Sequence, residues 1–233
     1  MNDPDPTLVD FPTPALPPGT VQVRADELVK LLRRLAPFPG SSTAAVTLRY
    51  VWLTTAGKRL VGFASDTGTA AQATAQTYGD GPGLPLAGIL PVDIAELAKA
   101  LKEVDNLVQL VPVGAELIVR KRDDELARVP VRVPTSSDER FIGQLEAELH
   151  ESHRLATKSS LPLGYVNLAP HVVNRFKLGR NTGDVWYAPH GRGFVRVDAN
   201  FCGHFKPVGP TRSTRPTPTA PLHIFPATRE AAA

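Results

Sequence analysis

The sequence is poor in cysteine and in long apolar runs. Its 233 residues include one cysteine, Cys202, which excludes an intramolecular disulfide framework. No apolar run approaches the roughly 18 residues that a membrane-spanning helix needs. The first residues are acidic and proline-rich, without the basic and apolar regions of a secretory signal peptide. These features predict a cytoplasmic protein with no membrane partner.

Signatures of enzyme chemistry are also scarce. No glycine-rich loop precedes a Lys-Ser or Lys-Thr pair, so no phosphate-binding P-loop is predicted. His150 and His153 lie one residue too close for the His-Glu-x-x-His zinc pattern, and no third ligand follows at ordered spacing. Cys202 and His204 could form a nucleophile and base, but a buried core thiol is the simpler interpretation. The sequence therefore predicts no catalytic residues, no metal and no cofactor.

Repetition is the main positive signal. Residues 21–35, 86–101 and 165–178 each run from a short apolar strand through a turn into an amphipathic helix. Strand-like runs follow, at residues 46–52, 60–64, 70–78, 108–113, 116–121 and 127–133. Asp66 falls at the end of one such run and is interpreted as a turn-capping residue. The pattern predicts an α+β protein in which a β-α-β-β-β half-module is used about three times.

The predicted helices share a basic side. In the first helix, leucines gather on one face and cations on the opposite face, at about 100° per residue. The second helix contributes two lysines diluted by Glu96 and Glu103, and the third is shorter. One basic face is typical of any solvated surface helix, but its repetition favours a common basic surface. The candidate residues are Arg24, Lys30, Arg33, Arg34, Lys99, Lys102, Arg175 and Lys177.

Several segments resemble a known family. They are GFASD at residues 62–66, ILP at 89–91, the hairpin sequence at 116–134 and FCGHFKPV at 201–208, where Lys-Pro stands in place of a usual Met-Pro. Their order and the leucine-rich first helix resemble a domain of a DNA polymerase sliding clamp, with the bacterial β-clamp and phage processivity clamps as the nearest relatives. The resemblance covers residues 20–135 well and 136–210 in patches.

This resemblance implies a fold and a function. Antiparallel sheets would form an outer wall, and the helices would line a channel. A homo-oligomeric ring, with a trimer favoured over a dimer, would encircle double-stranded DNA without sequence specificity and tether a DNA polymerase after a clamp loader opens it. The eight cations named above would face phosphates; the net charge of +3, which becomes +6 for residues 20–233, suits this partner. The expected location is the bacterial nucleoid or a phage-infected bacterial cell.

The chain divides into four predicted parts. Residues 1–19 form a proline-rich disordered arm, and residues 20–135 a clamp-like domain of two half-modules. Residues 136–208 form a reduced second domain, which opens with an acidic helix over 137–158. That acidity argues against a position in the channel. Residues 209–233 form a disordered tail with the apolar cluster PLHIF at 221–225.

Two other functions stay open. A clamp-derived adaptor would form no ring, and would bind a host sliding clamp or a polymerase through its tail. Leu222, Ile224 and Phe225 match the apolar half of the clamp-binding pattern Gln-Leu-x-Leu-Phe, although Pro221 replaces the glutamine. A chance cluster, or one that packs back on the body, is the alternative. An ordinary DNA-binding module would need aromatic stacking or a denser basic patch, and aromatic content is 6%.

The tail yields a direct prediction. A peptide of residues 217–228 should bind at micromolar level to a bacterial clamp or to this protein truncated at residue 208. Its three apolar anchors each contribute about 1.5–3 kcal/mol before ordering costs. Fluorescence anisotropy titration measures the binding, with a Leu222→Ala, Phe225→Ala peptide as the control. Equal binding of both peptides, or no saturable binding, contradicts the prediction.

Overall fold

The computed structural model describes residues 19–41, 43–79, 83–158, 170–176, 184–187 and 193–206. Its helices are α1 (Ala25–Leu35), the 3-10 helix η1 (Val46–Arg49), α2 (Pro91–Ala100), α3 (Ser136–Lys158) and α4 (Pro170–Phe176). Its strands are β1 (Val21–Arg24), β2 (Val51–Ala56), β3 (Arg59–Ser65), β4 (Thr69–Tyr78), β5 (Ala87–Ile89), β6 (Leu107–Val113), β7 (Glu116–Lys121), β8 (Asp124–Pro130), β9 (Asp184–Tyr187), β10 (Gly193–Asp198) and β11 (Phe201–Phe205).

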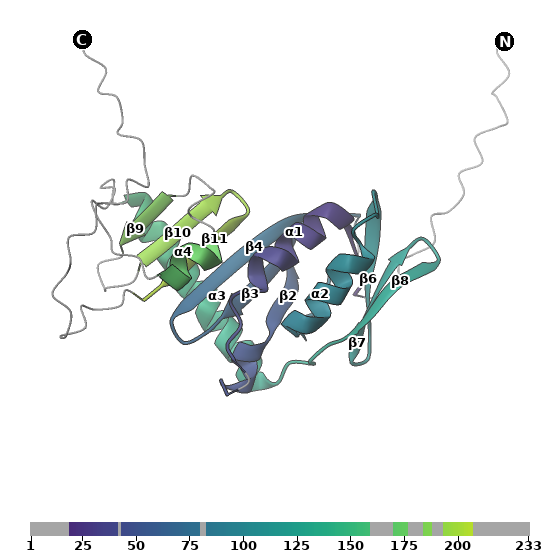
Figure 1. Cartoon of the computed structure of the whole chain (residues 1–233), viewed down its shortest axis with the longest axis horizontal. Coiled ribbons are helices and arrows are strands. Elements are labelled where there is room, and N and C mark those ends of the chain that lie inside the picture. The colour runs from purple at the N-terminus through teal and green to yellow at the C-terminus, as the bar shows by residue number, and fades with distance from the viewer. Residues whose placement is uncertain are drawn as a thin grey trace, which may run out of the picture.

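The elements fall into three units (Figure 1). We call β1-α1-β2-β3-β4 the first unit, β5-α2-β6-β7-β8 the second, and α4-β9-β10-β11 the third. The first two interlock, because β5 pairs with β2 and β1 pairs with β6. This arrangement confirms the predicted α+β repetition. The strand expected before the third helix lies outside the described residues, as do residues 1–18 and the tail.

The strand β4 joins the units. Along one edge it pairs with β3 from Ala70 to Gln76. On the opposite edge, its first half pairs with β11 and its last residues pair with β1, both antiparallel. The strand order is β5-β2-β3-β4-β1-β6-β7-β8, with β11, β10 and β9 branching from β4. The third unit therefore extends the sheet of the first.

Helix α1 forms where the sequence analysis places it, for two local reasons. Leu28, Leu31, Leu32 and Leu35 recur at helical spacing and are all buried. Acidic residues lie in the first turn and Arg33 with Arg34 in the last, which complements the helix dipole. Helix α2 begins at a proline, whose missing N–H is not needed in a first turn.

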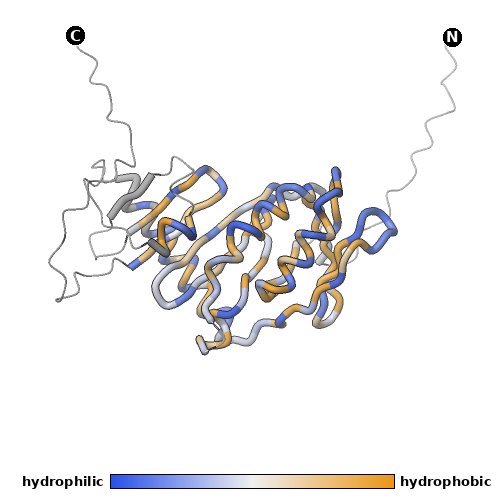
Figure 2. The backbone as a smooth tube through the Cα atoms, viewed as in Figure 1, coloured by the Kyte–Doolittle hydropathy of each residue, from blue (hydrophilic) through white to orange (hydrophobic). Residues whose placement is uncertain are grey.

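The sheet has a hydrophobic cluster on each face. On one face, α1, α2 and α4 cover a large cluster that includes Leu60 of β3 and Val195 of β10. On the other face, α3 packs Ile142, Leu145 and Leu149 against a smaller cluster made by Trp52, Val61, Phe63 and Ala70. Figure 2 shows hydrophobic and hydrophilic residues interspersed along the backbone tube of the strands and helices. The acidic helix α3 thus lies opposite the face that carries α1, α2 and α4.

Two predicted strands differ from the structure. The run at residues 46–52 was expected to be extended throughout, yet Val46–Arg49 form η1 and β2 begins at Val51. Two contacts with nearby residues hold this turn: the Leu48 carbonyl accepts the Gly40 N–H at 2.7 Å, and the Trp52 indole donates to the Thr47 carbonyl at 2.9 Å. The run at 127–133 is shifted, because β8 begins at Asp124 and ends at Pro130.

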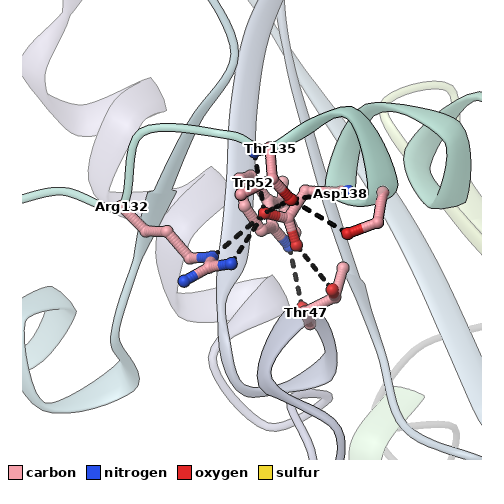
Figure 3. Close-up of polar contacts among 6 residues, drawn as sticks. Thr47, Trp52, Arg132, Thr135 and Asp138 are labelled. Atoms are coloured by element: carbon pink, nitrogen blue, oxygen red, sulfur yellow. Dashed lines mark hydrogen bonds and ion pairs between the residues drawn. The ribbon is translucent and has the colours of Figure 1, made fainter.

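A buried carboxylate fastens the start of α3 to the sheet (Figure 3). Asp138 is fully buried and accepts hydrogen bonds from the Thr47 hydroxyl at 2.5 Å and from Arg132 at 2.9 and 3.1 Å. The N–H and hydroxyl of Thr135 add bonds of 2.9 and 2.8 Å. Burial alone would raise the pKa of Asp138, but these donors outweigh it and lower the pKa to about 2.

This network predicts a pH-dependent stability difference. Asp138→Asn should lower the free energy of unfolding by about 2 kcal/mol at neutral pH, because the replacement amide leaves Arg132 without its charged partner. A depressed pKa stabilises the fold above the unfolded value near 4, and this contribution is lost as the pH falls toward 2. The gap between wild type and variant should therefore shrink over that range in urea unfolding measurements. Exposed Asp105→Asn is the control, and a pH-independent gap contradicts the argument.

Candidate nucleic-acid interface

A groove lies on the helix-covered face. It has a volume of about 540 Å³ and runs between α1, the segment that follows α2, and α4 with β11. Val29, Val104, Phe176 and Phe201 give it apolar walls. Five of the predicted phosphate-facing residues line it: Lys30, Arg33, Arg34, Lys102 and Arg175. Asp26 is the acidic residue among the described lining residues, and it is paired with Arg24 at 3.0 Å.

The cations of the groove differ in whether they form ion pairs and in how exposed they are. Lys30 and Arg33 are exposed, and within the described part of the chain they form no ion pair. Lys102 is exposed and lies 3.6 Å from Glu103, while Lys99 is exposed on α2 outside the groove. Exposed lysines and arginines without a tight partner can approach a polyanion at little cost. The helix face therefore offers exposed positive charge.

Arg34 and Arg175 are held in place instead. Arg34 makes a two-pronged ion pair with Asp198, and its guanidinium lies 5.2 Å from the centre of the Phe201 ring. Arg175 donates to the Asp66 carboxylate and to the Thr69 hydroxyl. Contact with phosphates stays a prediction for both residues. The structure adds an intramolecular partner that the sequence analysis missed.

The two aspartates are also turn caps. Asp66 accepts the N–H groups of Gly68 and Thr69 at 2.7 and 2.6 Å, which confirms its interpretation as a turn-capping residue. Burial raises the pKa of Asp66, but the Arg175 guanidinium and these N–H groups outweigh that effect and lower it. The pKa of Asp198 is lowered in the same way, through Arg34 and the Asn200 N–H. Both carboxylates are therefore charged at neutral pH.

Comparison with solved structures identifies the fold. A DNA polymerase III β subunit from Thermotoga maritima superposes with a TM-score of 0.60 at 13% identity, over 86% of this chain and 69% of that one. DNA polymerase sliding clamps from Bacillus subtilis and Pseudomonas aeruginosa each give 0.59, at 14% and 15% identity, over 67% and 69% of their own length. The protein has the sliding-clamp fold. Its sequence matches no protein-family model and no curated protein.

A Helicobacter pylori β clamp bound to a DNA ligase peptide is a further match, with a TM-score of 0.55 and 11% identity. Arg24 lies at the start of α1, paired with Asp26, and Lys177 falls outside the described residues. The peptide-like residues Leu222, Ile224 and Phe225 also lie outside the described residues.

The remaining candidates for chemistry are plain structural features. Cys202 is partly buried, and burial raises the pKa of its thiol to about 11, so the thiol stays protonated at neutral pH. Within the described residues, no three His, Cys, Asp or Glu side chains gather as metal ligands would.

Across the same part of the chain, no helix combines the length and apolar character that crossing a membrane requires.

Proposed function

We propose that this protein is a sliding-clamp-like DNA processivity factor that encircles duplex DNA and tethers a DNA polymerase. The observation that carries the proposal is the shared helix face of α1, α2 and α4, whose exposed cations surround a groove in a chain with the sliding-clamp fold. It supports a binding function rather than an enzyme.

The charges on this face suit sliding. Lys30, Arg33 and Lys102 would attract phosphates from the groove, and Arg24 and Lys99 would add to the field along α1 and α2. Phosphate contacts carry no base information, so they hold a duplex without fixing a register. Acidic residues on the same helices keep the attraction weak. Weak, sequence-independent attraction lets a ring move along DNA.

The sheet offers an edge for assembly. Among the described residues, β8 pairs with β7 alone, so its outer hydrogen-bonding groups are free. A ring of identical subunits, with a trimer favoured, would use such an edge, and a loader would open the ring onto DNA. The other proposed partners are a DNA polymerase, which the ring would tether, and a host sliding clamp, which would bind the tail. The proposed location is the bacterial cytoplasm, at the nucleoid.

The first test of this function concerns salt dependence. Each phosphate contact contributes about 0.9 to the slope of log affinity against log salt, so Lys30→Ala with Arg33→Ala should lower the slope by up to about two. Arg34 is left intact because it is paired with Asp198. Anisotropy titrations of duplex DNA at several salt concentrations give the slope.

The matched control removes two exposed cations elsewhere, with Lys58→Ala in the β2–β3 turn and Arg140→Ala on α3. It should leave the slope unchanged. A slope that is the same in the groove variant and the wild type, or that falls equally in the control, contradicts binding by the helix face.

The second test concerns topology. Protein assembled at high concentration on nicked circular DNA should stay bound during gel filtration, and should leave once a restriction enzyme linearises the circle. Blocking both ends of the linear DNA with a bound protein should restore retention. Equal retention on open circular and linear DNA removes the ring and favours the adaptor.

A further inference from the structure

Two hairpin turns in different units are built alike. The turn at residues 66–69 joins β3 to β4, and the turn at 198–201 joins β10 to β11. Each opens with an aspartate that accepts the N–H two residues later, Gly68 at 2.7 Å in one turn and Asn200 at 2.8 Å in the other. In each turn the first and fourth residues are backbone partners. The two aspartates therefore occupy equivalent positions.

Each aspartate is bound by an arginine from the other unit. Arg34 is the penultimate residue of α1. It pairs with Asp198, the first residue of the third unit's turn, and its guanidinium lies over the ring of Phe201, the fourth residue of that turn. Arg175 is the penultimate residue of α4. It pairs with Asp66, the first residue of the first unit's turn, and donates to the hydroxyl of Thr69, the fourth residue of that turn. The two sets of contacts are reciprocal.

A local two-fold arrangement explains the reciprocity. Strands β4 and β11 pair antiparallel, with Ala71 opposite Gly203 near the centre of the joint. Phe38 follows α1, and Phe176 is the last residue of α4. Their rings pack edge to face, with the ring centroids 4.8 Å apart. An arginine–aspartate pair lies at each end of this joint. Both pairs are partly shielded from water, where charge-assisted hydrogen bonds are stronger than at an exposed site.

The second unit lacks this arrangement although it has the same strands. Its strands β7 and β8 are joined by the two-residue turn Arg122-Asp123, and Lys121 pairs with Asp124 across the turn. Lys121 thus stands where the first unit has Asp66. An arginine approaching the free edge of β8 in the manner of Arg175 would meet the like charge of Lys121 at the position of the Asp66 carboxylate, which costs binding energy. The acceptor of this turn, Asp124, lies instead at the fourth position, where the first unit has Thr69. The tip of this hairpin is hydrophilic (Figure 2).

We propose that the two arginine–aspartate pairs are a reciprocal latch that fastens the third unit to β4 and selects β4 over the otherwise equivalent edge of β8. The latch also builds the groove, because α1 supplies one wall while Phe176 and Phe201 of the third unit supply another. Opening it would separate those walls. The latch does not depend on what the groove binds.

Hydrogen exchange of the full chain tests the latch. Asp66→Asn and Asp198→Asn keep an oxygen that can cap each turn and remove only the charge. The double variant should exchange the amides of β10 and β11 at least about tenfold faster than the wild type, since charged hydrogen bonds hold that local opening closed. Amides of β6 and β7 should be unaffected. Asp123→Asn, in the turn of the second unit, is the matched control and should change neither set.

Selection is tested by Asp66→Lys, which gives the first unit the charge of Lys121. It should release β10 and β11 further than Asp66→Ala does, although both variants lose the ion pair and the turn cap. Unchanged exchange in the asparagine double variant, or an equal rise in every strand, overturns the latch. Equal exchange in Asp66→Lys and Asp66→Ala overturns the selection of β4.

Discussion

The hydrogen-bonding edge of β4 is the constraint on which the structure depends. A ten-residue strand has more backbone groups along one edge than either β1 or β11 can satisfy alone, so the two share it. Sharing places the third unit at the start of β4 and β1 at its end, and β1 in turn pairs with β6 of the second unit. Ala71, Ala73 and Ala75 are buried on the helix side of β4 and leave room for helices to approach. The helix face and its groove follow from that junction.

Local patterns in the sequence predict much of this fold. The leucines of α1 recur at helical spacing, the proline that opens α2 marks its start, and the alternation in β3 separates Leu60 from Val61 onto opposite faces. These features depend on residues close in sequence, so periodicity reveals them. The basic faces of α1 and α2 were predicted for the same reason. Repetition also pointed to the sliding-clamp fold that the solved structures show.

What the sequence did not reveal lies in contacts between distant residues. Arg34 and Asp198 are 164 positions apart. Nothing in the helix pattern distinguishes Arg34, which is paired, from Arg33, which has no ion pair among the described residues. Thr47 and Asp138 are 91 positions apart, and their bond helps to turn a predicted strand into η1. Tertiary contacts override local propensity at such positions. The only sequence signal available was an aspartate at the start of each turn.

The route of α3 has a consequence for access to the helix face. A helix of 23 residues spans about 35 Å, and α3 uses this length to cross the sheet on the side away from α1, α2 and α4. The described part of the connection between the second and third units, helix α3, therefore lies on the back of the sheet. Within the described part of the chain, no strand crosses the face of the sheet that carries α1, α2 and α4. A long polymer bound to that face would therefore contact the side chains of three helices directly.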